Sequence, residues 1–320
     1  MKTAFITGIL GQDGIHLSNF LVEKGYKVFG LLNNKSNPSL AGFLNRFPTI
    51  NLIEGDLTNL ESLHRALNLT NPDEIYNLGG MSSVSFSFSN AKSSMEVNGK
   101  GALNLLEATK SLKNYQNVKF YQASSSEMYG KTTESPQNEL TRFNPVSPYG
   151  EAKVYAHEVC IRYREIYGMQ VSCGILFNHE GEHRSEEFVT RKITKSLAQI
   201  SQGRLDKIKL GTLESKRDWG YAGDYIEAMW LMLQKKTPDD FVVATGKTHS
   251  VRDFLTIAVK AAGLKGDPED YVVIDDRYRR PTEVNHLVGD ASKAKRILGW
   301  EPKVNFEELV LIMLNQDMKI

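Results

Sequence analysis

The sequence predicts an α/β protein with a doubly wound parallel sheet and a smaller, interleaved C-terminal lobe. Short apolar strands alternate with amphipathic helical segments through the first half of the chain, and this alternation is typical of βαβ units in a parallel sheet. The first strand also runs directly into a glycine-spaced turn at 3–14, "TAFITGILGQDG", as strands of such sheets do where they enter a helix. Both observations favour a sheet with helices on its two faces.

The elements follow from short apolar runs, which we interpret as strands, and from amphipathic segments, which we interpret as helices. In the first half, strands are expected at 4–6, 27–32, 50–54, 74–78, 118–123 and 170–177. Helices are expected between them near 12–24, 59–68, 93–112 and 147–167. After Gly181 the alternation loosens. There we expect strands at 207–213 and 241–244, and helices near 187–202, near 223–235, from Ser250, from Ala291 and near 305–318.

The first turn spaces Gly8, Gly11 and Gly14 as G-x-x-G-x-x-G. Glycines there allow a tight turn, a close approach of the backbone to a ligand and close packing of helix on strand, and a pyrophosphate fits the N-terminus of the following helix. An ordinary strand-to-helix turn is the alternative for three glycines alone. On the first interpretation, residues 1–180 with parts of 222–245 form a Rossmann-type dinucleotide-binding domain, and 181–320 form mainly a substrate-binding lobe.

The composition excludes several classes of function. A formal net charge of +1 over 320 residues gives no basic surface for nucleic acid. No apolar run approaches a membrane span, and the N-terminus does not have the form of a signal peptide. Cys160 and Cys173 supply no disulfide framework, and no histidine has metal-ligand spacing with another ligand type, so no metal is expected. We expect a cytoplasmic protein without a membrane or nucleic-acid partner.

Two segments carry candidate catalytic residues. "SPYGEAK" places Tyr149 and Lys153 four residues apart, on one face of one helix. An ammonium one turn away can lower the pKa of the phenol, which can then exchange a proton with a sugar or alcohol hydroxyl. Ser125 and Glu127 in "QASSSEMYG" follow the end of a strand, where ligands bind in doubly wound sheets. A surface tyrosine and a solvated lysine are the alternative for the Tyr–Lys pair by itself.

The glycine turn, the strand-end serine and Y-x-x-x-K, in this order, resemble the extended short-chain dehydrogenase/reductase family. Within it the chain is similar, essentially from end to end, to the GDP-mannose 4,6-dehydratases. The segments that carry this similarity are "ITGILGQDG", "YQASSSEMYG", "SPYGEAK", "GILFNHE", "FVTRKIT", "RDWGYAGDY" and "DRYRRPTEV". The resemblance implies a GDP-sugar substrate, a nicotinamide cofactor and a homo-oligomer.

The resemblance also implies a mechanism and the residues that perform it. Tyr149, aided by Ser125 and Lys153, takes the hydroxyl proton while a hydride leaves sugar C4 for the nicotinamide. Glu127 then removes the C5 proton of the 4-keto sugar, water leaves from C6, and the hydride returns to C6. A simple dehydrogenase needs no carboxylate beside Tyr149, so Glu127 is the residue that indicates a dehydratase.

The implied binding residues fall into two groups. Those expected at the cofactor are Gly8, Gly11, Gln12, Asp13, Gly14, Asn33, Asn34, Lys35, Asp56, Leu57, Leu78, Gly80, Ser82, Tyr149, Lys153, His179 and Arg184. Those expected at the nucleotide sugar are Ser87, Asn178, Val189, Lys192, Arg217, Arg280 and Glu283. The arginines and the lysine suit a pyrophosphate by their charge.

Three departures from the family's pattern bear on the cofactor, the assembly and the sugar. Asn33 and Asn34 stand where the family has an arginine pair, yet no acid follows the second strand, so NADP is expected and NAD is possible. The loop after that strand looks shorter than in the family, which favours a dimer over a tetramer. Gly80, Met81 and their neighbours also differ, which leaves the identity of the sugar open.

The expected activity is therefore conversion of GDP-mannose to GDP-4-keto-6-deoxymannose by an NADP-dependent lyase. One alternative is a dehydratase, C4 oxidase or epimerase that acts on another GDP-sugar, such as a GDP-heptose. A second alternative, from a different class of function, is a non-catalytic sensor that binds a nicotinamide cofactor. The combination of Ser125, Glu127, Tyr149 and Lys153 argues against the sensor, which has no need of all four.

Overall fold

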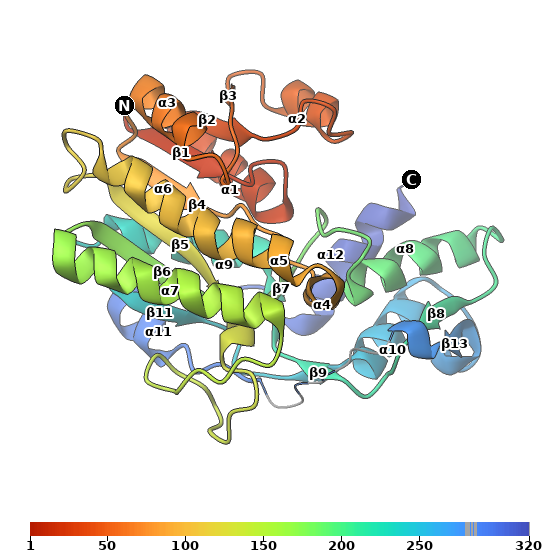
Figure 1. Ribbon diagram of the computed structural model, residues 1–320. Coiled ribbons are helices and arrows are strands. Elements are labelled where there is room, and N and C mark those ends of the chain that lie inside the picture. The colour runs from red at the N-terminus through yellow and green to blue at the C-terminus, as the bar shows by residue number, and fades with distance from the viewer. Residues whose placement is uncertain (279–281, 283, 285–286, 320) are drawn as a thin grey trace.

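The computed structural model describes residues 1–278, 282, 284 and 287–319. A seven-stranded sheet lies at the centre of the described residues, in the order β11-β6-β5-β4-β1-β2-β3, and all its neighbouring strands are parallel (Figure 1). The strands are β1 (Thr3–Thr7), β2 (Lys27–Leu32), β3 (Asn51–Glu54), β4 (Glu74–Asn77), β5 (Lys119–Ser125), β6 (Gln170–Leu176) and β11 (Asp240–Val243). The order reverses between β1 and β4, and ligands bind at such a switch point, outside the carboxyl ends of the strands.

This sheet confirms the predicted fold class, and each strand begins and ends within two residues of its expected bounds. The central strands are buried on both faces: all four residues of β4 and all but the first of β5 are buried. Strands covered on both faces form continuous apolar runs in the sequence, which is why the strands in the first half of the chain could be predicted.

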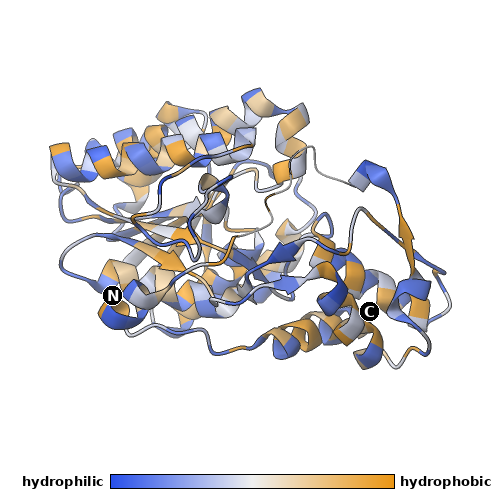
Figure 2. Ribbon diagram, turned by 90° about the horizontal axis from the view of Figure 1, so that it is seen from below, coloured by the Kyte–Doolittle hydropathy of each residue, from blue (hydrophilic) through white to orange (hydrophobic). Residues whose placement is uncertain are grey.

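Helices cover both faces of the sheet, and each face has its own core. The helices on one face are α1 (Gln12–Glu23), α9 (Ala222–Gln234) and α11 (Ser292–Leu298), and those on the other are α3 (Leu60–Thr70), α6 (Gly101–Lys110) and α7 (Pro148–Tyr167). Leu17 and Met229 are fully buried on the first face, and Leu63 and Leu105 on the second. Each such side chain stabilises the fold by about 1.5–3 kcal/mol by leaving water. Polar and apolar residues alternate along the helices, as expected where one side meets the sheet (Figure 2).

The segment near 93–112, predicted as one helix, is divided in the structure. It consists of α5 (Ala91–Ser94), the π-helical turn η1 (Met95–Lys100) and α6. A π turn adds a residue to the turn and so changes which side chains face the sheet, and such turns are frequent at functional sites. The sequence also missed α2 (Leu40–Arg46) and α4 (Val84–Ser89). Both helices are too short for a helical period to be recognised.

The second lobe has a separate core that includes Ile193, Phe254 and Met313 (right in Figure 1). Its elements are α8 (Val189–Ser201), β8 (Ile208–Leu210), α10 (Val251–Ala261), β13 (Val272–Ile274) and α12 (Phe306–Met318). The remaining elements are the paired strands β7 (Asn178–Glu180) and β10 (Trp219–Tyr221), the pair β9 (Lys216–Arg217) and β12 (His249–Ser250), and the 3-10 turns η2 (Ser126–Met128), η3 (Pro268–Tyr271) and η4 (Asp276–Tyr278). In the described part of the chain, no helix combines the length and the apolar character that crossing a membrane requires.

The predicted interleaving is confirmed, because the chain returns to the sheet between elements of the second lobe. Asp218, between β9 and β10, stabilises one of the places where the chain passes between the second lobe and the sheet. Its buried carboxylate accepts hydrogen bonds from Thr245 N (2.9 Å) and Oγ1 (2.6 Å), from Gly246 N (2.9 Å) and from Gly289 N (3.2 Å). One side chain thus joins the strands that lead into α9, the turn after β11 and the segment before α11.

Replacing Asp218 with asparagine is expected to destabilise the fold by about 2–4 kcal/mol, because an amide cannot accept from all of these donors and leaves some of them buried and unpaired. Urea unfolding measures the change. Asp206→Asn, at an exposed position, is the matched control and is expected to change stability by less than about 0.5 kcal/mol. Equal stability of the Asp218 variant and the parent would contradict the role of this carboxylate.

Candidate active site

A cavity of about 750 Å³ opens at the carboxyl end of the sheet, beside the switch point between β1 and β4. Its lining comes from the segments that follow β1, β2, β4, β5 and β6, and from α7. It brings together most of the residues that the sequence predicted for catalysis and binding. These are Gly8, Gly11, Gln12, Asp13, Gly14, Asn33, Asp56, Leu57, Leu78, Gly80, Ser82, Ser125, Glu127, Tyr149, Lys153, Asn178, His179 and Arg184.

The glycine turn fits a dinucleotide. Gly8 has φ of +70°, and a Cβ atom there would lie 2.8 Å from the Gly79 backbone. A Cβ atom on Gly14 would lie 2.4 Å from the Gly8 carbonyl oxygen, so neither position tolerates a side chain. Gly11 caps α1 without a side-chain hydrogen bond, which leaves the first N–H groups of the helix for a ligand. Since these groups border the cavity, they suit the pyrophosphate of a nicotinamide dinucleotide.

Tyr149 is positioned by the start of α7. Ser147 caps this helix by accepting a hydrogen bond from Gly150 N (3.1 Å), and Ser87 Oγ accepts one from Tyr149 N (3.2 Å). The phenol is hydrogen-bonded to the Ser125 hydroxyl. Lys153 Nζ lies 5.7 Å from the centre of the Tyr149 ring. The three predicted groups therefore meet in one buried corner of the cavity.

The expectation that Lys153 lowers the pKa of Tyr149 is wrong for the chain by itself. Burial raises the pKa of Tyr149 to about 12, and the hydrogen bond from Ser125 offsets only part of this rise. Burial also lowers the pKa of Lys153 to about 8, while its ammonium donates to the Ala123 carbonyl (2.9 Å). Spacing on a helix predicted the proximity of the two groups, but the loss of water around both of them dominates their proton affinities.

Glu127 reaches the same corner from η2, the 3-10 turn that directly follows β5. Ser125 Oγ accepts a hydrogen bond from Glu127 N (3.2 Å), which holds the turn against the strand end. The carboxyl group is buried, and its charge contributes to the raised pKa of Tyr149. A carboxylate and a phenol thus face one cavity, as a reaction with two proton transfers requires.

Asp13 and His179 join α1 to β7 at the side of the cavity. His179 Nε2 lies 2.9 Å from Asp13 Oδ2, its Nδ1 lies 2.8 Å from the Phe177 carbonyl, and its ring stacks on Tyr225 at 4.8 Å. Burial opposes the charge on each partner. The attraction between the pair outweighs it, so the pKa of Asp13 falls well below its usual value and that of His179 rises. An imidazolium paired with a carboxylate results.

Several predicted residues lie outside the lining of the cavity. Lys35 Nζ forms an exposed ion pair with Glu54 (2.6 Å), and the Asn34 side chain accepts from Ser36 N (2.8 Å). Ser87 supports the backbone of Tyr149, as described above.

The remaining expected substrate residues come from the second lobe. Val189 begins α8, and Lys192 Nζ lies 3.3 Å from the centre of the Tyr278 ring. Arg217 is buried and donates to the Val284 carbonyl (3.1 Å). Arg280 and Glu283 lie outside the described residues. The structure thus brings most of the predicted catalytic and cofactor-binding residues to one cavity, whereas most of the predicted substrate-binding residues lie outside its lining.

Comparison with known proteins agrees with this geometry. The sequence model of the family described as "GDP-mannose 4,6 dehydratase" matches residues 5–313. GDP-mannose 4,6 dehydratase 1 of Arabidopsis thaliana is 48% identical over 329 residues, which span 100% of this chain and 90% of that protein. The GDP-mannose 4,6 dehydratase of Homo sapiens is 46% identical over 342 residues, which span 100% of this chain and 92% of that protein. The chain belongs to the GDP-mannose 4,6-dehydratase family.

Solved structures place this family member in the predicted wider fold family. UDP-glucose 4-epimerase of Thermotoga maritima, with UDP-glucose, superposes with a TM-score of 0.86 at 25% identity and spans 99% of this chain and 98% of that one. dTDP-glucose 4,6-dehydratase of Bacillus anthracis, in complex with NAD, gives a TM-score of 0.83 at 21% identity and spans 100% and 97%. The predictions of an extended short-chain dehydrogenase/reductase and of a lyase are confirmed at the level of the family. The dTDP-glucose 4,6-dehydratase and the similar UDP-glucose 4-epimerase of Thermus thermophilus are both in complex with NAD.

Sequence reasoning missed several polar side chains of this GDP-mannose 4,6-dehydratase family site, among them Thr7, Asn37 and Asn98. Asn98, in η1, lines the cavity beside Gly80, and its amide both accepts from Met81 N (2.9 Å) and donates to the Met81 carbonyl (3.2 Å). It fixes the segment that follows β4. Nothing in its neighbourhood distinguished it from a polar residue on the outer face of a helix, because the π turn that directs it inward was not predictable.

The Asp13–His179 pair predicts a pH-dependent contribution to stability. The raised pKa of His179 means that its contribution is complete below the unfolded value of about 6.5 and is lost as the pH rises through the folded value. The lowered pKa of Asp13 means that its contribution is present above about pH 4 and is lost as the pH falls. We therefore expect Asp13→Asn to cost about 1–3 kcal/mol near pH 5.5 and clearly less near pH 9. Urea unfolding at both pH values, with Asp206→Asn as control, measures this, and an equal cost at both would contradict the ionic pair.

Proposed function

We propose that the chain converts GDP-mannose to GDP-4-keto-6-deoxymannose by 4,6-dehydration. The observation that carries this proposal is the position of Glu127 in the buried corner that also contains Ser125, Tyr149 and Lys153. A phenol and a lysine suffice for the oxidation or reduction of an alcohol, whereas elimination of water also needs a base for a C–H bond. Membership of the GDP-mannose 4,6-dehydratase family supports the same assignment.

The residues of the cavity take the following roles in this proposal. Tyr149 receives the proton of the C4 hydroxyl, with Ser125 sharing its hydrogen bond. Lys153, with a pKa of about 8, lies one helical turn away and can carry the proton onward. Bound nicotinamide supplies reversible hydride acceptance, from C4 in the oxidation and to C6 in the final reduction. Glu127 takes the C5 proton, which the C4 ketone makes acidic, and a proton is returned to the C6 hydroxyl as it leaves as water.

A different GDP-sugar, such as a GDP-heptose, remains a second candidate substrate. Met81 and Gly80 line the cavity at the segment that departs from the family's pattern. A flexible apolar side chain in place of a hydrogen-bonding one lowers the selectivity for a particular hydroxyl pattern. The alternative activities of a C4 oxidase or epimerase are argued against by Glu127.

For the cofactor we propose NADP, with NAD accepted more weakly. No acidic residue directly follows β2 in the sequence to bind a ribose 2′-hydroxyl, and Asn33 and Asn37 line the cavity there. Lys35 is held by an exposed ion pair with Glu54, and exposed pairs of this kind contribute little, so a 2′-phosphate can recruit the ammonium. Arg184 also lines the cavity, but Glu180 neutralises part of its charge (2.9 Å).

We also propose that the chain forms a homodimer. α4 and α7 pack against each other and expose Phe86 and Tyr155, which are 44% and 38% accessible to solvent. Apolar side chains on adjoining helices favour a contact between two copies. The short α2 that follows β2 offers little additional surface for a tetramer.

The activity test compares the parent with Glu127→Gln. With GDP-mannose and NADP, the parent is expected to form a product that lacks one water, detected by mass spectrometry, and to exchange the C5 hydrogen with deuterated solvent. Glu127→Gln is expected to lose product formation by about 10²-fold or more and to accumulate reduced cofactor with a 4-keto sugar, because the amide cannot accept the C5 proton. Glu61→Gln, exposed near the start of α3, is the matched control. Parental rates in Glu127→Gln would rule out this base, and turnover of a GDP-heptose but not of GDP-mannose would transfer the activity to the other sugar.

The cofactor proposal predicts that NADP binds about tenfold more tightly than NAD, as expected for one charge-assisted hydrogen bond. Lys35→Gln should bring the two dissociation constants together by weakening NADP alone. Lys236→Gln, an exposed lysine at the end of α9, serves as control. Titration calorimetry of the parent and both variants with each cofactor measures the six constants. Equal binding of NAD and NADP to the parent would contradict the assignment of Lys35.

A further inference from the structure

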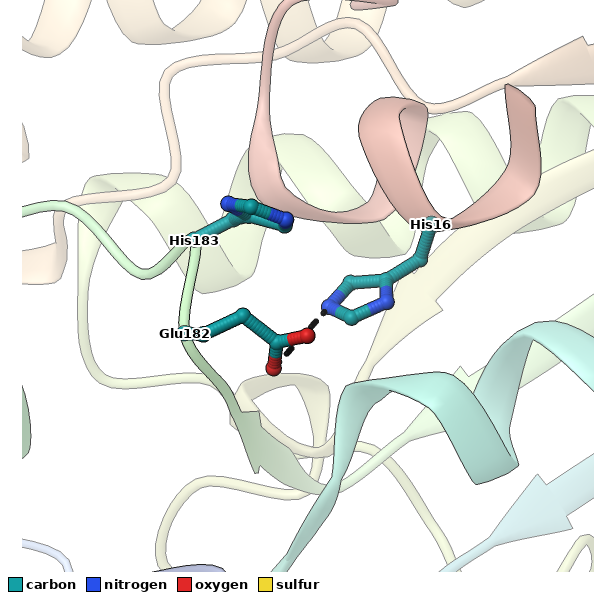
Figure 3. A group of neighbouring side chains, drawn as sticks. All are labelled: His16, Glu182 and His183. Carbon is teal, nitrogen blue, oxygen red and sulfur yellow. Dashed lines mark ion pairs between the residues drawn. The ribbon is translucent and has the colours of Figure 1, made fainter. Parts of the chain in front are cut away.

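Three side chains that the proposed reaction does not use converge beside the cavity. His16 comes from α1, and Glu182 and His183 come from the turn that follows β7 (Figure 3). One potential ligand atom from each residue lies within 4.8 Å of the other two, and His16 Nε2 lies 3.8 Å from Glu182 Oε2. His16 and Glu182, which are 166 positions apart in the chain, are thus brought together where α1 meets the turn that follows β7.

The donor atoms of this cluster are poorly satisfied by the protein. The His16 side chain is only 11% exposed, and its Nε2 atom has no hydrogen-bond partner among the described residues. Among the described residues, the contacts of the Glu182 carboxylate are long: the Tyr221 hydroxyl lies 3.4 Å from each oxygen, and His16 Nε2 lies 3.8 Å from Oε2. An imidazole nitrogen that lacks a hydrogen bond and faces a carboxylate and a second imidazole is available to bind a cation.

We propose that His16, Glu182 and His183 form a binding site for a divalent transition-metal ion, with zinc as the best fit. Two imidazole nitrogens and one carboxylate oxygen form a donor set that zinc prefers, with a fourth position left open. Magnesium and calcium require oxygen donors and are not expected to bind. Bonds of about 2.0–2.2 Å in a tetrahedron place ligand atoms roughly 3.4 Å apart, so binding draws the three groups together from their present open spacing.

Arg46 is the competitor for this site. Its Nη1 atom lies 2.8 Å from His183 Nε2, where it occupies the lone pair of the ring and adds a positive charge. Arg46 is the exposed last residue of α2, so its guanidinium can move into solvent when a cation enters. The site therefore binds a metal ion at the expense of the Arg46 contact, and removal of Arg46 favours the ion.

Metal binding would tie two borders of the catalytic cavity together. The N-terminus of α1 borders the cavity through Gly11 and Asp13, and the turn that carries Glu182 continues into Arg184 and Phe188, which also line it. The expectation from the sequence that no metal binds rested on the spacing of potential ligands within short segments. Ligands contributed by α1 and by a turn far along the chain leave no such pattern.

In the test, bound metal is first removed from the full chain with a chelator. The chain is then titrated with zinc chloride in the presence of a competing chromogenic chelator. We expect one zinc ion per chain, and each of His16→Gln, Glu182→Gln and His183→Gln should weaken binding by about tenfold or more. His64→Gln, on the distant helix α3, is the matched control and should bind zinc as the parent does. Cobalt(II) should give a visible absorption band in the parent that the three ligand variants lose, and magnesium should not compete.

Arg46→Gln keeps the proposal testable even if a ligand variant folds poorly. It leaves all three ligands in place and removes only the competing cation, so zinc should bind several-fold more tightly than to the parent. Failure of the parent to bind stoichiometric zinc, equal binding by parent and ligand variants, or weaker binding after Arg46→Gln would each overturn the proposal.

Discussion

The contact of the glycine turn after β1 with the surrounding backbone is the constraint on which the rest of the structure depends. Gly8 lies against Gly79 at the end of β4, and Gly14 lies against the Gly8 carbonyl, each so closely that a single Cβ atom would overlap. These contacts set the distance of α1 from the sheet. From that distance follow the open helix N-terminus in the cavity, the reach of Asp13 to His179 and the approach of His16 to Glu182.

The opposite wall of the cavity depends on desolvation rather than on close backbone contact. Ser125 and Glu127 continue from the end of a fully covered strand, and Tyr149 and Lys153 stand on the first turns of α7. Burial moves the pKa of the phenol upward and that of the ammonium downward, because the loss of water disfavours the charged form of each group. Charges that develop in such a site interact strongly because little water remains to screen them.

Sequence reasoning succeeded where a residue's role depends on its immediate neighbours. Buried strands gave continuous apolar runs, and the Tyr–Lys spacing placed both groups on one helix face. It failed where the role depends on distant packing. The π turn that directs Asn98 inward, the pairing of Lys35 with Glu54 and the short helix α2 leave no periodic signal. The pKa of Tyr149 was also misjudged, because the sequence shows which charges are near but not how much water is excluded.

The interleaving of the two lobes has a consequence for how the chain folds as it is synthesised. Until residues 222–243 leave the ribosome, β6 is an open edge of the sheet, and the face that α9 covers, including Tyr76 and Leu17, is uncovered. An open edge beside an apolar face invites pairing with other chains. The first 180 residues therefore do not form a self-sufficient folding unit, although they carry most of the sheet.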